Sequence, residues 1–335
     1  MSSESCDPSS AAGPSAAGRA GPVSHPTSPS QYGLKLLSNQ KDGDPVVDII
    51  LVGDISIPVQ SPWGLGTDFP WPEKIPSVDV FEFCYPVDEV ATSNNQANAI
   101  EALGKNISWK AICDRARKLK EAVNNPNRFT QIRRASHVIL VGYGYGGLLC
   151  ERVITLSPQN SPASDIIKGL VLFGTPNFSH GLRQWAHIVV KATAKEEVGA
   201  VSTGASVKMR DTIAKLFTQG PGRSKDMPNL ASLEGYYRRI SRFQRQFFDI
   251  TREPGWEAKI VSCFPESSPS SPEQSLTILP EWSTIPHAFP ISVRKPYLKM
   301  TTFDGGDEQE YQVLSRLIGE WIKKMVDNQG ETPSI

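Results

Sequence analysis

The feature that most limits the possible folds is a glycine-rich turn between an apolar run and a helical segment. Residues 136–141 (SHVILV) predict a buried strand, and the sequence from Leu148 onward predicts a helix. Between them stand four glycines, at positions 142, 144, 146 and 147. Glycine permits left-handed backbone angles and close approach of strand and helix. The segment therefore predicts a strand, a very tight turn and a helix.

This arrangement is typical of two kinds of functional site. Gly142, Gly144 and Gly147 satisfy G-x-G-x-x-G, the phosphate-binding turn of dinucleotide sites. That site needs an acidic residue after the following strand, where this chain has Phe173-Gly174-Thr175. The segment also fits G-x-S-x-G, the nucleophile elbow of hydrolases, with Gly144 in the serine position. Because glycine has no nucleophilic atom, this second hypothesis predicts an elbow without its chemistry, and nucleotide binding stays a minor alternative.

Short β-branched runs alternate with polar or amphipathic segments along much of the chain. These runs predict buried strands at 46–52, 78–83, 138–141, 170–173 and 259–264. The last helix is expected at 311–326, with an apolar stripe that packs on the sheet. Strands that alternate with helices predict an α/β fold with a mainly parallel, doubly wound sheet.

Composition divides the chain into three parts. Residues 1–31 are rich in Ser, Pro, Ala and Gly and predict a disordered tail, and 327–335 predict a flexible C-terminal tail. One domain is expected over 32–326, with a helical, cap-like excursion at about 192–250. Within it, residues 236–250 predict an amphipathic helix whose aromatic stripe faces the core and whose arginines face solvent. Membrane contact through the arginine face is the less favoured alternative.

Charge and cysteine content exclude several classes of function. The 35 basic and 35 acidic residues cancel, which argues against nucleic acid as a partner. The five cysteines show no metal-binding spacing, so neither a metal nor another cofactor is expected. No apolar run approaches the roughly 20 residues of a membrane span, and the N-terminal residues lack the apolar core of a signal peptide. The sequence predicts a cytoplasmic protein.

Further landmarks follow one another from Tyr32 to Val326. They are Tyr32-Gly33-Leu34, VDIILVG at 47–53, Trp71-Pro72, Phe83-Cys84-Tyr85, LFGTP at 172–176 and MTTF at 300–303. In this order the chain resembles the serine-active-site-containing (SERAC-like) α/β hydrolases, which occur alone and as N-terminal domains of fungal NACHT and ankyrin-repeat proteins. The resemblance implies an α/β-hydrolase fold and hydrolysis of acyl esters or lipids by a Ser, acid, His triad in that chain order.

The resemblance assigns the three triad positions, and two of them lack the required group. The nucleophile position falls on Gly144. The histidine position, six residues before Phe303, falls on Tyr297. The acid position falls on Glu266, which keeps a carboxylate.

Positions around the triad also differ from the family. The His-Gly of the oxyanion region is replaced by Gly53-Asp54, and Tyr145 follows the nucleophile position. Asn177 stands where a histidine usually follows Gly-Thr-Pro. We expect Tyr143, Tyr145 and Tyr297 to fill the emptied site by packing.

These substitutions predict a pseudoenzyme that serves as a binding or regulatory module for a protein partner or a small apolar ligand. The alternative is an active serine-hydrolase-type esterase or lipase with a displaced nucleophile. The resemblance also leaves open a peripheral location at endoplasmic-reticulum or mitochondrial membranes.

Overall fold

The computed structural model describes the sheet, its covering helices and the segments beside them. The described residues are 32–38, 47–54, 63, 69–85, 109–124, 137–157, 166–177, 230–253, 256, 259–265, 285, 287–295, 299–306 and 308–330. Several predictions fall outside them: the 1–31 tail, residues 192–229 of the cap-like excursion, Glu266, Tyr297 and the last five residues.

Seven strands form one sheet in the order β1-β3-β2-β4-β5-β6-β7. Their bounds are β1 Gly33–Ser38, β2 Val47–Val52, β3 Val78–Cys84, β4 His137–Tyr143, β5 Ile167–Phe173, β6 Lys259–Pro265 and β7 Phe289–Val293. β1 runs antiparallel to β3, and the other five neighbouring pairs are parallel. The prediction of a mainly parallel sheet is confirmed.

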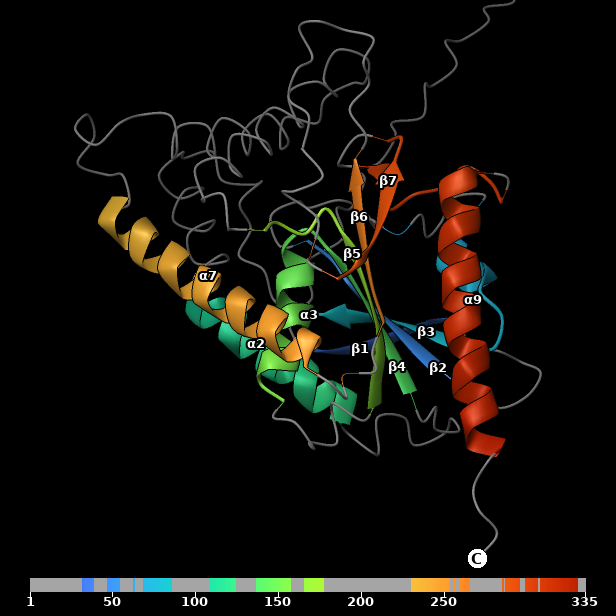
Figure 1. Cartoon of the computed structure of the whole chain (residues 1–335), viewed down its shortest axis with the longest axis horizontal. Coiled ribbons are helices and arrows are strands. Elements are labelled where there is room, and N and C mark those ends of the chain that lie inside the picture. Colours follow the sequence, from blue (N-terminus) through green and yellow to red (C-terminus); the bar gives the residue numbers. More distant parts are fainter. Residues whose placement is uncertain are drawn as a thin grey trace, which may run out of the picture.

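Helices cover both faces of this sheet. On one face lie α2 (Trp109–Asn124), α3 (Tyr145–Thr155) and α7 (Leu230–Arg252). On the other face lie α9 (Gln309–Gly330) and the short 3-10 helix η1 (Trp71–Lys74). Figure 1 views the sheet nearly edge-on, with α9 on one side and the other three α-helices on the opposite side. The doubly wound arrangement follows from this two-sided cover.

The central strands show why their sequences read as continuous apolar runs. In β2, Ile50 and Val52 belong to the core under α2, α3 and α7, whereas Ile49 and Leu51 belong to the core under α9. Successive residues of a strand point to opposite faces, so a sheet covered on both sides needs apolar residues at every position.

The two predicted helical stripes are confirmed where side chains are described. On α9 the predicted stripe is buried or partly buried: Leu314, Leu317, Ile318, Trp321, Ile322 and Met325. On α7, Ile240, Phe243 and Phe247 are buried in the core shared with α2 and α3.

Four elements were not predicted: β1, β7, α2 and the short η1. The edge strand β1 has mostly half-buried side chains, and the five-residue β7 contains Pro290, which weakens a strand pattern. The amphipathic α2 begins after a long stretch without strand signals.

Within the described part of the chain, no helix is long and apolar enough to cross a bilayer. The described residues also contain no group of three or more His, Cys, Asp or Glu that would hold a metal ion.

Candidate functional site at the turn after β4

Gly144 forms the turn between β4, the middle strand of the sheet, and α3. Its backbone angles are φ 55° and ψ −123°. These angles match the first central position of a type II′ turn, where glycine is free of strain and other residues are not. The N–H of Gly144 donates a hydrogen bond of 2.8 Å to the carbonyl of Phe173, at the end of β5. Gly144 therefore lies at the carboxyl edge of the sheet, where ligands bind in open α/β folds.

The neighbouring glycines are required by close packing. A Cβ on Gly142 would lie 2.5 Å from the Cα of Gly147. A Cβ on Gly146 would collide with the carbonyl oxygens of Val52 and Gly53. Strand, turn and helix thus approach as closely as a nucleophile elbow requires. The turn keeps the shape of an elbow although its central residue has no side chain.

The end of β2 brings Gly53 and Asp54 beside this turn. The Tyr85 hydroxyl donates a hydrogen bond of 2.5 Å to the carbonyl oxygen of Gly53. Burial raises the pKa of Tyr85, and the negative charge of Asp54 raises it further. The guanidinium of Arg115 lies 5.1 Å from the centre of the Tyr85 ring. Asp54 therefore lies close enough to Tyr85 for its charge to act on the hydroxyl, and its assignment to an oxyanion region stays a prediction.

The two tyrosines of the turn lie in different cores. Tyr143 is fully buried and meets the Trp63 ring edge-on, with ring centres 6.4 Å apart, on the α9 side. Tyr145 is buried on the opposite side, in the core under α2, α3 and α7. Both side chains are packed into the molecule beside the turn. The expectation that they fill an emptied site stays a prediction.

The segment after β5 closes another side of the turn. Gly174 has φ 55°, and its N–H donates a hydrogen bond of 2.8 Å to the carbonyl of Cys263. The side chain of Thr175 lies where a Cβ of Gly147 would have to be, so it packs directly on the first turn of α3. Asn177, two residues further on, is half-buried. The structure thus places Thr175 beside the elbow, a residue to which the sequence assigned no role.

Gln244 on α7 joins this segment to a buried carboxyl group on α3. Glu151 is fully buried, and its Oε2 accepts a hydrogen bond of 2.9 Å from Gln244 on α7. The same Gln244 nitrogen donates to the carbonyl of Pro176 at 3.0 Å. Burial raises the pKa of Glu151 to about 8, against the opposing effect of the hydrogen bond from Gln244. The sequence signal was an acid inside the apolar run of α3, but periodicity alone does not tell which face of the helix is covered.

Histidine, the usual general base, is absent from the described surroundings of Gly144. His137 opens β4, at the edge of the sheet opposite to Gly144 and about 20 Å away along the strand. His287 precedes β7, also at the amino edge, and accepts a hydrogen bond of 2.9 Å from Arg252. Neither reaches the elbow. The other three histidines lie outside the described residues.

Two buried cysteines, Cys150 and Cys263, are poor replacement nucleophiles. Burial raises the pKa of Cys150 on α3 and of Cys263 on β6. A thiol attacks as its thiolate, so both groups are held in the unreactive form.

No protein-family model matches the chain, and no curated protein matches it in sequence. Solved structures are similar at low identity. A lipase-esterase related protein from Clostridium acetobutylicum has 9% identity and a TM-score of 0.46, over 87% of this chain and 99% of that one. Est1E from Butyrivibrio proteoclasticus has 12% identity and a TM-score of 0.37, over 88% and 93%. The α/β hydrolase domain-containing protein 10 from mouse has 12% identity and a TM-score of 0.38, over 87% and 94%.

At these identities and TM-scores the likeness says nothing about the chemistry at Gly144. The fold is defined by the chain's own features: a mainly parallel sheet, helices on both faces, and an elbow-shaped turn after the middle strand. It is an α/β-hydrolase fold.

Proposed function

We propose that this chain is an α/β-hydrolase-fold protein without hydrolytic chemistry at its elbow, and that it acts as a binding or regulatory module. The observation that carries the proposal is Gly144. The turn has the backbone of an elbow, and its central residue has no atom that attacks a carbonyl. Removing a member of a catalytic triad lowers the rate by several orders of magnitude, and no pKa shift restores a missing nucleophile.

The other triad positions support the same proposal. The resemblance puts Tyr297 at the histidine position and Glu266 at the acid position. A carboxylate acts in such a triad by orienting a histidine, so Glu266 without its partner has no catalytic role. The resemblance also puts Asp54 in the oxyanion region, where its charge has the wrong sign.

We infer from the sequence landmarks that the module is related to the SERAC-like hydrolases. The position of the elbow at the carboxyl edge of the sheet supports binding of a small apolar ligand or a protein segment there. The cytoplasm is the proposed location, with the surface of endoplasmic-reticulum or mitochondrial membranes as the alternative.

The second candidate is an active esterase or lipase with a displaced nucleophile. It agrees with the names of the similar solved structures, which are esterases and lipases. It requires an activated Ser, Thr or Cys at the carboxyl edge of the sheet. Thr175 is the described hydroxyl beside the elbow, but it is buried and no described histidine lies near it. The nucleophile would then belong to residues outside the described part.

Covalent labelling with a fluorophosphonate probe separates the two candidates. The wild type, Gly144→Ala, Gly144→Ser and the double variant Gly144→Ser/Tyr297→His are treated in parallel. We expect no labelling of the wild type or of Gly144→Ala, and labelling of the double variant at position 144.

Gly144→Ala is the matched control, because it imposes the same backbone strain as serine without adding a hydroxyl. Labelling of the wild type at any residue supports the displaced nucleophile. If the double variant folds and is not labelled, the turn is not a usable elbow and the proposal loses its structural basis.

A further inference from the structure

Helix α7 carries a stripe of arginines on its exposed side. The stripe consists of Arg238, Arg239, Arg242 and Arg245, and all four are exposed. None of them forms an ion pair or hydrogen bond with a residue that the structure describes. Residues 235–248 contain no acidic side chain. Because Ile240, Phe243 and Phe247 anchor the opposite side of the helix in the core, the arginines are held toward solvent.

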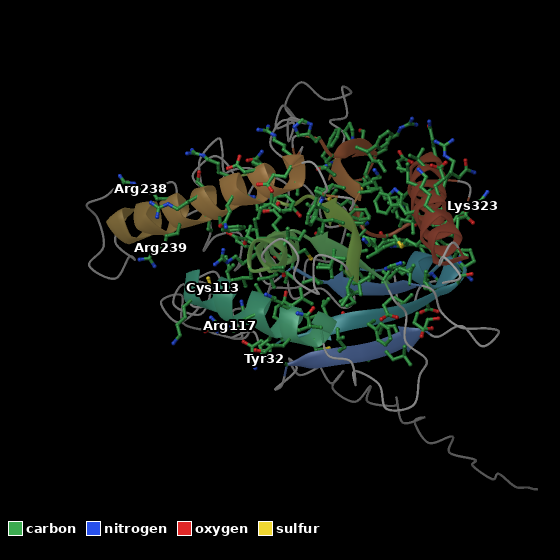
Figure 2. All side chains as sticks on the ribbon, turned by 60° about the horizontal axis from the view of Figure 1, so that its bottom comes forward. Tyr32, Cys113, Arg117, Arg238, Arg239 and Lys323 are labelled. Carbon is green, nitrogen blue, oxygen red and sulfur yellow. The ribbon has the colours of Figure 1, made fainter. Side chains whose placement is uncertain are left out.

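Helix α2 lies in the same layer as α7, and its exposed charges are partly paired, Arg117 with Asp114 at 2.9 Å and Lys118 with Glu121 at 2.7 Å. Ile112 and Leu119 of α2 share one hydrophobic core with Ile240 of α7. Figure 2 shows Arg238 and Arg239 at the outlying end of α7, at the same end of the molecule as Arg117 on α2. Residues 110–124 and 238–253 together hold ten cations and four carboxylates, a net charge of +6, in a chain whose net charge is zero.

Helix α9, on the other face of the sheet, is built differently. Its exposed cations are Arg316, Lys323 and Lys324. Like the arginines of α7, these three cations form no ion pair with a residue that the structure describes. Residues 309–327 hold three cations and three carboxylates, so their net charge is zero. The excess of positive charge therefore lies in the layer of α2 and α7 and not in every helix of this protein.

We propose that the basic face, defined as Arg238, Arg239, Arg242 and Arg245 of α7, docks on the headgroups of an anionic lipid bilayer without inserting. A guanidinium group can donate two parallel hydrogen bonds to a phosphate or carboxylate group, and four of them stand on the exposed side of this helix. Insertion of α7 is excluded by its own packing, since its apolar stripe is already buried against the core.

Among the described side chains of α2 and α7, the lack of exposed apolar anchors favours a lipid surface over a protein partner. Protein interfaces concentrate their binding energy in large apolar and aromatic side chains at the centre. The exposed large apolar side chains among the described residues are Tyr32, Phe289 and Val326, and none belongs to α2 or α7. A face that offers charge alone fits a surface of headgroups. This proposal does not depend on whether the elbow is catalytically silent.

Vesicle sedimentation tests the basic face directly. The full-length protein is mixed with vesicles of 70% phosphatidylcholine and 30% phosphatidylserine, and with vesicles of pure phosphatidylcholine. We expect binding to the anionic vesicles only. Raising the salt from 50 to 500 mM should weaken it strongly, because the screening length of charge interactions falls from about 14 Å to about 4 Å. The triple variant Arg238→Gln/Arg242→Gln/Arg245→Gln should bind on the order of a hundredfold more weakly, since each cation contributes about 1 kcal/mol at such a surface.

The triple variant Arg316→Gln/Lys323→Gln/Lys324→Gln on α9 is the matched control. It removes the same charge from exposed helix positions and should bind like the wild type. Equal loss in both variants would show that net charge matters and not the basic face, which overturns the proposal. The proposal is also overturned if the wild-type protein does not bind the anionic vesicles. Tighter binding to a 20-base-pair DNA duplex or to a polyglutamate peptide than to the vesicles would overturn it as well.

Discussion

Gln244 on α7 and Glu151 on α3 share a hydrogen bond of 2.9 Å in the interior, where Glu151 is fully buried. Because the pKa of Glu151 is raised to about 8, the carboxyl group is mostly neutral at pH 7. The Oε1 atom of Glu151 has no hydrogen-bond partner among the described residues. Two helices and the segment after β5 thus meet around an acid that is costly to ionise.

This pair predicts that stability falls as the pH rises. The pKa of Glu151 is raised from about 4.5 to about 8 on folding, so its contribution to stability is fully present below about pH 4.5. It is lost progressively up to about pH 8, by an amount on the order of 5 kcal/mol. Glu151→Gln keeps the shape and removes the titration. Urea unfolding between pH 5 and 9 should show that this variant gains stability relative to the wild type as the pH increases.

Asp249→Asn serves as the control for that series, because Asp249 is an exposed carboxylate on α7. Its unfolding free energy should follow that of the wild type at every pH. A constant difference between Glu151→Gln and the wild type from pH 5 to 9 would contradict the assignment of a neutral buried acid.

The glycines of the elbow and of α9 should respond oppositely to the same change. Gly146→Ala places a Cβ against the carbonyl oxygens of Val52 and Gly53, which are backbone atoms that cannot turn away. We expect a loss of about 3 kcal/mol or more, or failure to fold. Gly319→Ala, within α9, meets no atom within 4 Å and should stabilise the protein by about 0.5–1 kcal/mol. Chemical denaturation measures the free energy of unfolding of both variants. Equal changes in that free energy would contradict the close packing at Gly146.

The neighbouring cations Lys295 and Arg294 should contribute differently to the free energy of unfolding. Its ammonium group donates hydrogen bonds to the Thr302 carbonyl (2.8 Å), to Asp304 (3.0 Å) and to Glu308 (2.9 Å), and its side chain is 17% exposed. Lys295→Met should therefore cost about 1–3 kcal/mol of unfolding free energy. Arg294→Met should cost less than about 0.5 kcal/mol, because Arg294 is 68% exposed and its contact with Glu310 is 3.5 Å long. Thermal unfolding that ranks the two variants in the reverse order would contradict this role of Lys295.

Gly144→Ala should be destabilising although it adds only a methyl group. Alanine at φ 55° and ψ −123° adopts a backbone conformation that costs about 1–3 kcal/mol. Gly144→Ser should cost a similar amount, since the strain comes from the Cβ atom. Urea unfolding measures both. Variants as stable as the wild type would show that the turn is not held in this conformation.

The sequence predicts the centre of the fold better than its edges. The runs that became β2 to β6 are apolar at nearly every position because both faces of the sheet are covered, and this signal is strong. β1 and β7 lie at the two edges, where exposure and Pro290 remove the pattern. Strand order was not predictable, since it depends on which crossover packs on which face.

For the candidate site, the sequence predicts the turn and not its surroundings. The spacing of Gly142, Gly144 and Gly146 was sufficient to predict an elbow. Gly142 and Gly146 have no room for a Cβ atom, and Gly144 has a positive φ that favours glycine. The contacts of Thr175, Gln244 and Glu151 join residues far apart in the chain. Contacts between residues so far apart cannot be predicted from a local sequence pattern.

Ester turnover by the wild-type protein decides whether this fold catalyses hydrolysis. Purified protein is given p-nitrophenyl esters from acetate to palmitate, and its rate is compared with that of Gly144→Ala and of buffer alone. We expect that neither protein exceeds the uncatalysed rate for any chain length. Hydrolysis by the wild type that a fluorophosphonate abolishes, with the label mapped by mass spectrometry to a residue of this chain, would contradict it and establish a nucleophile away from Gly144.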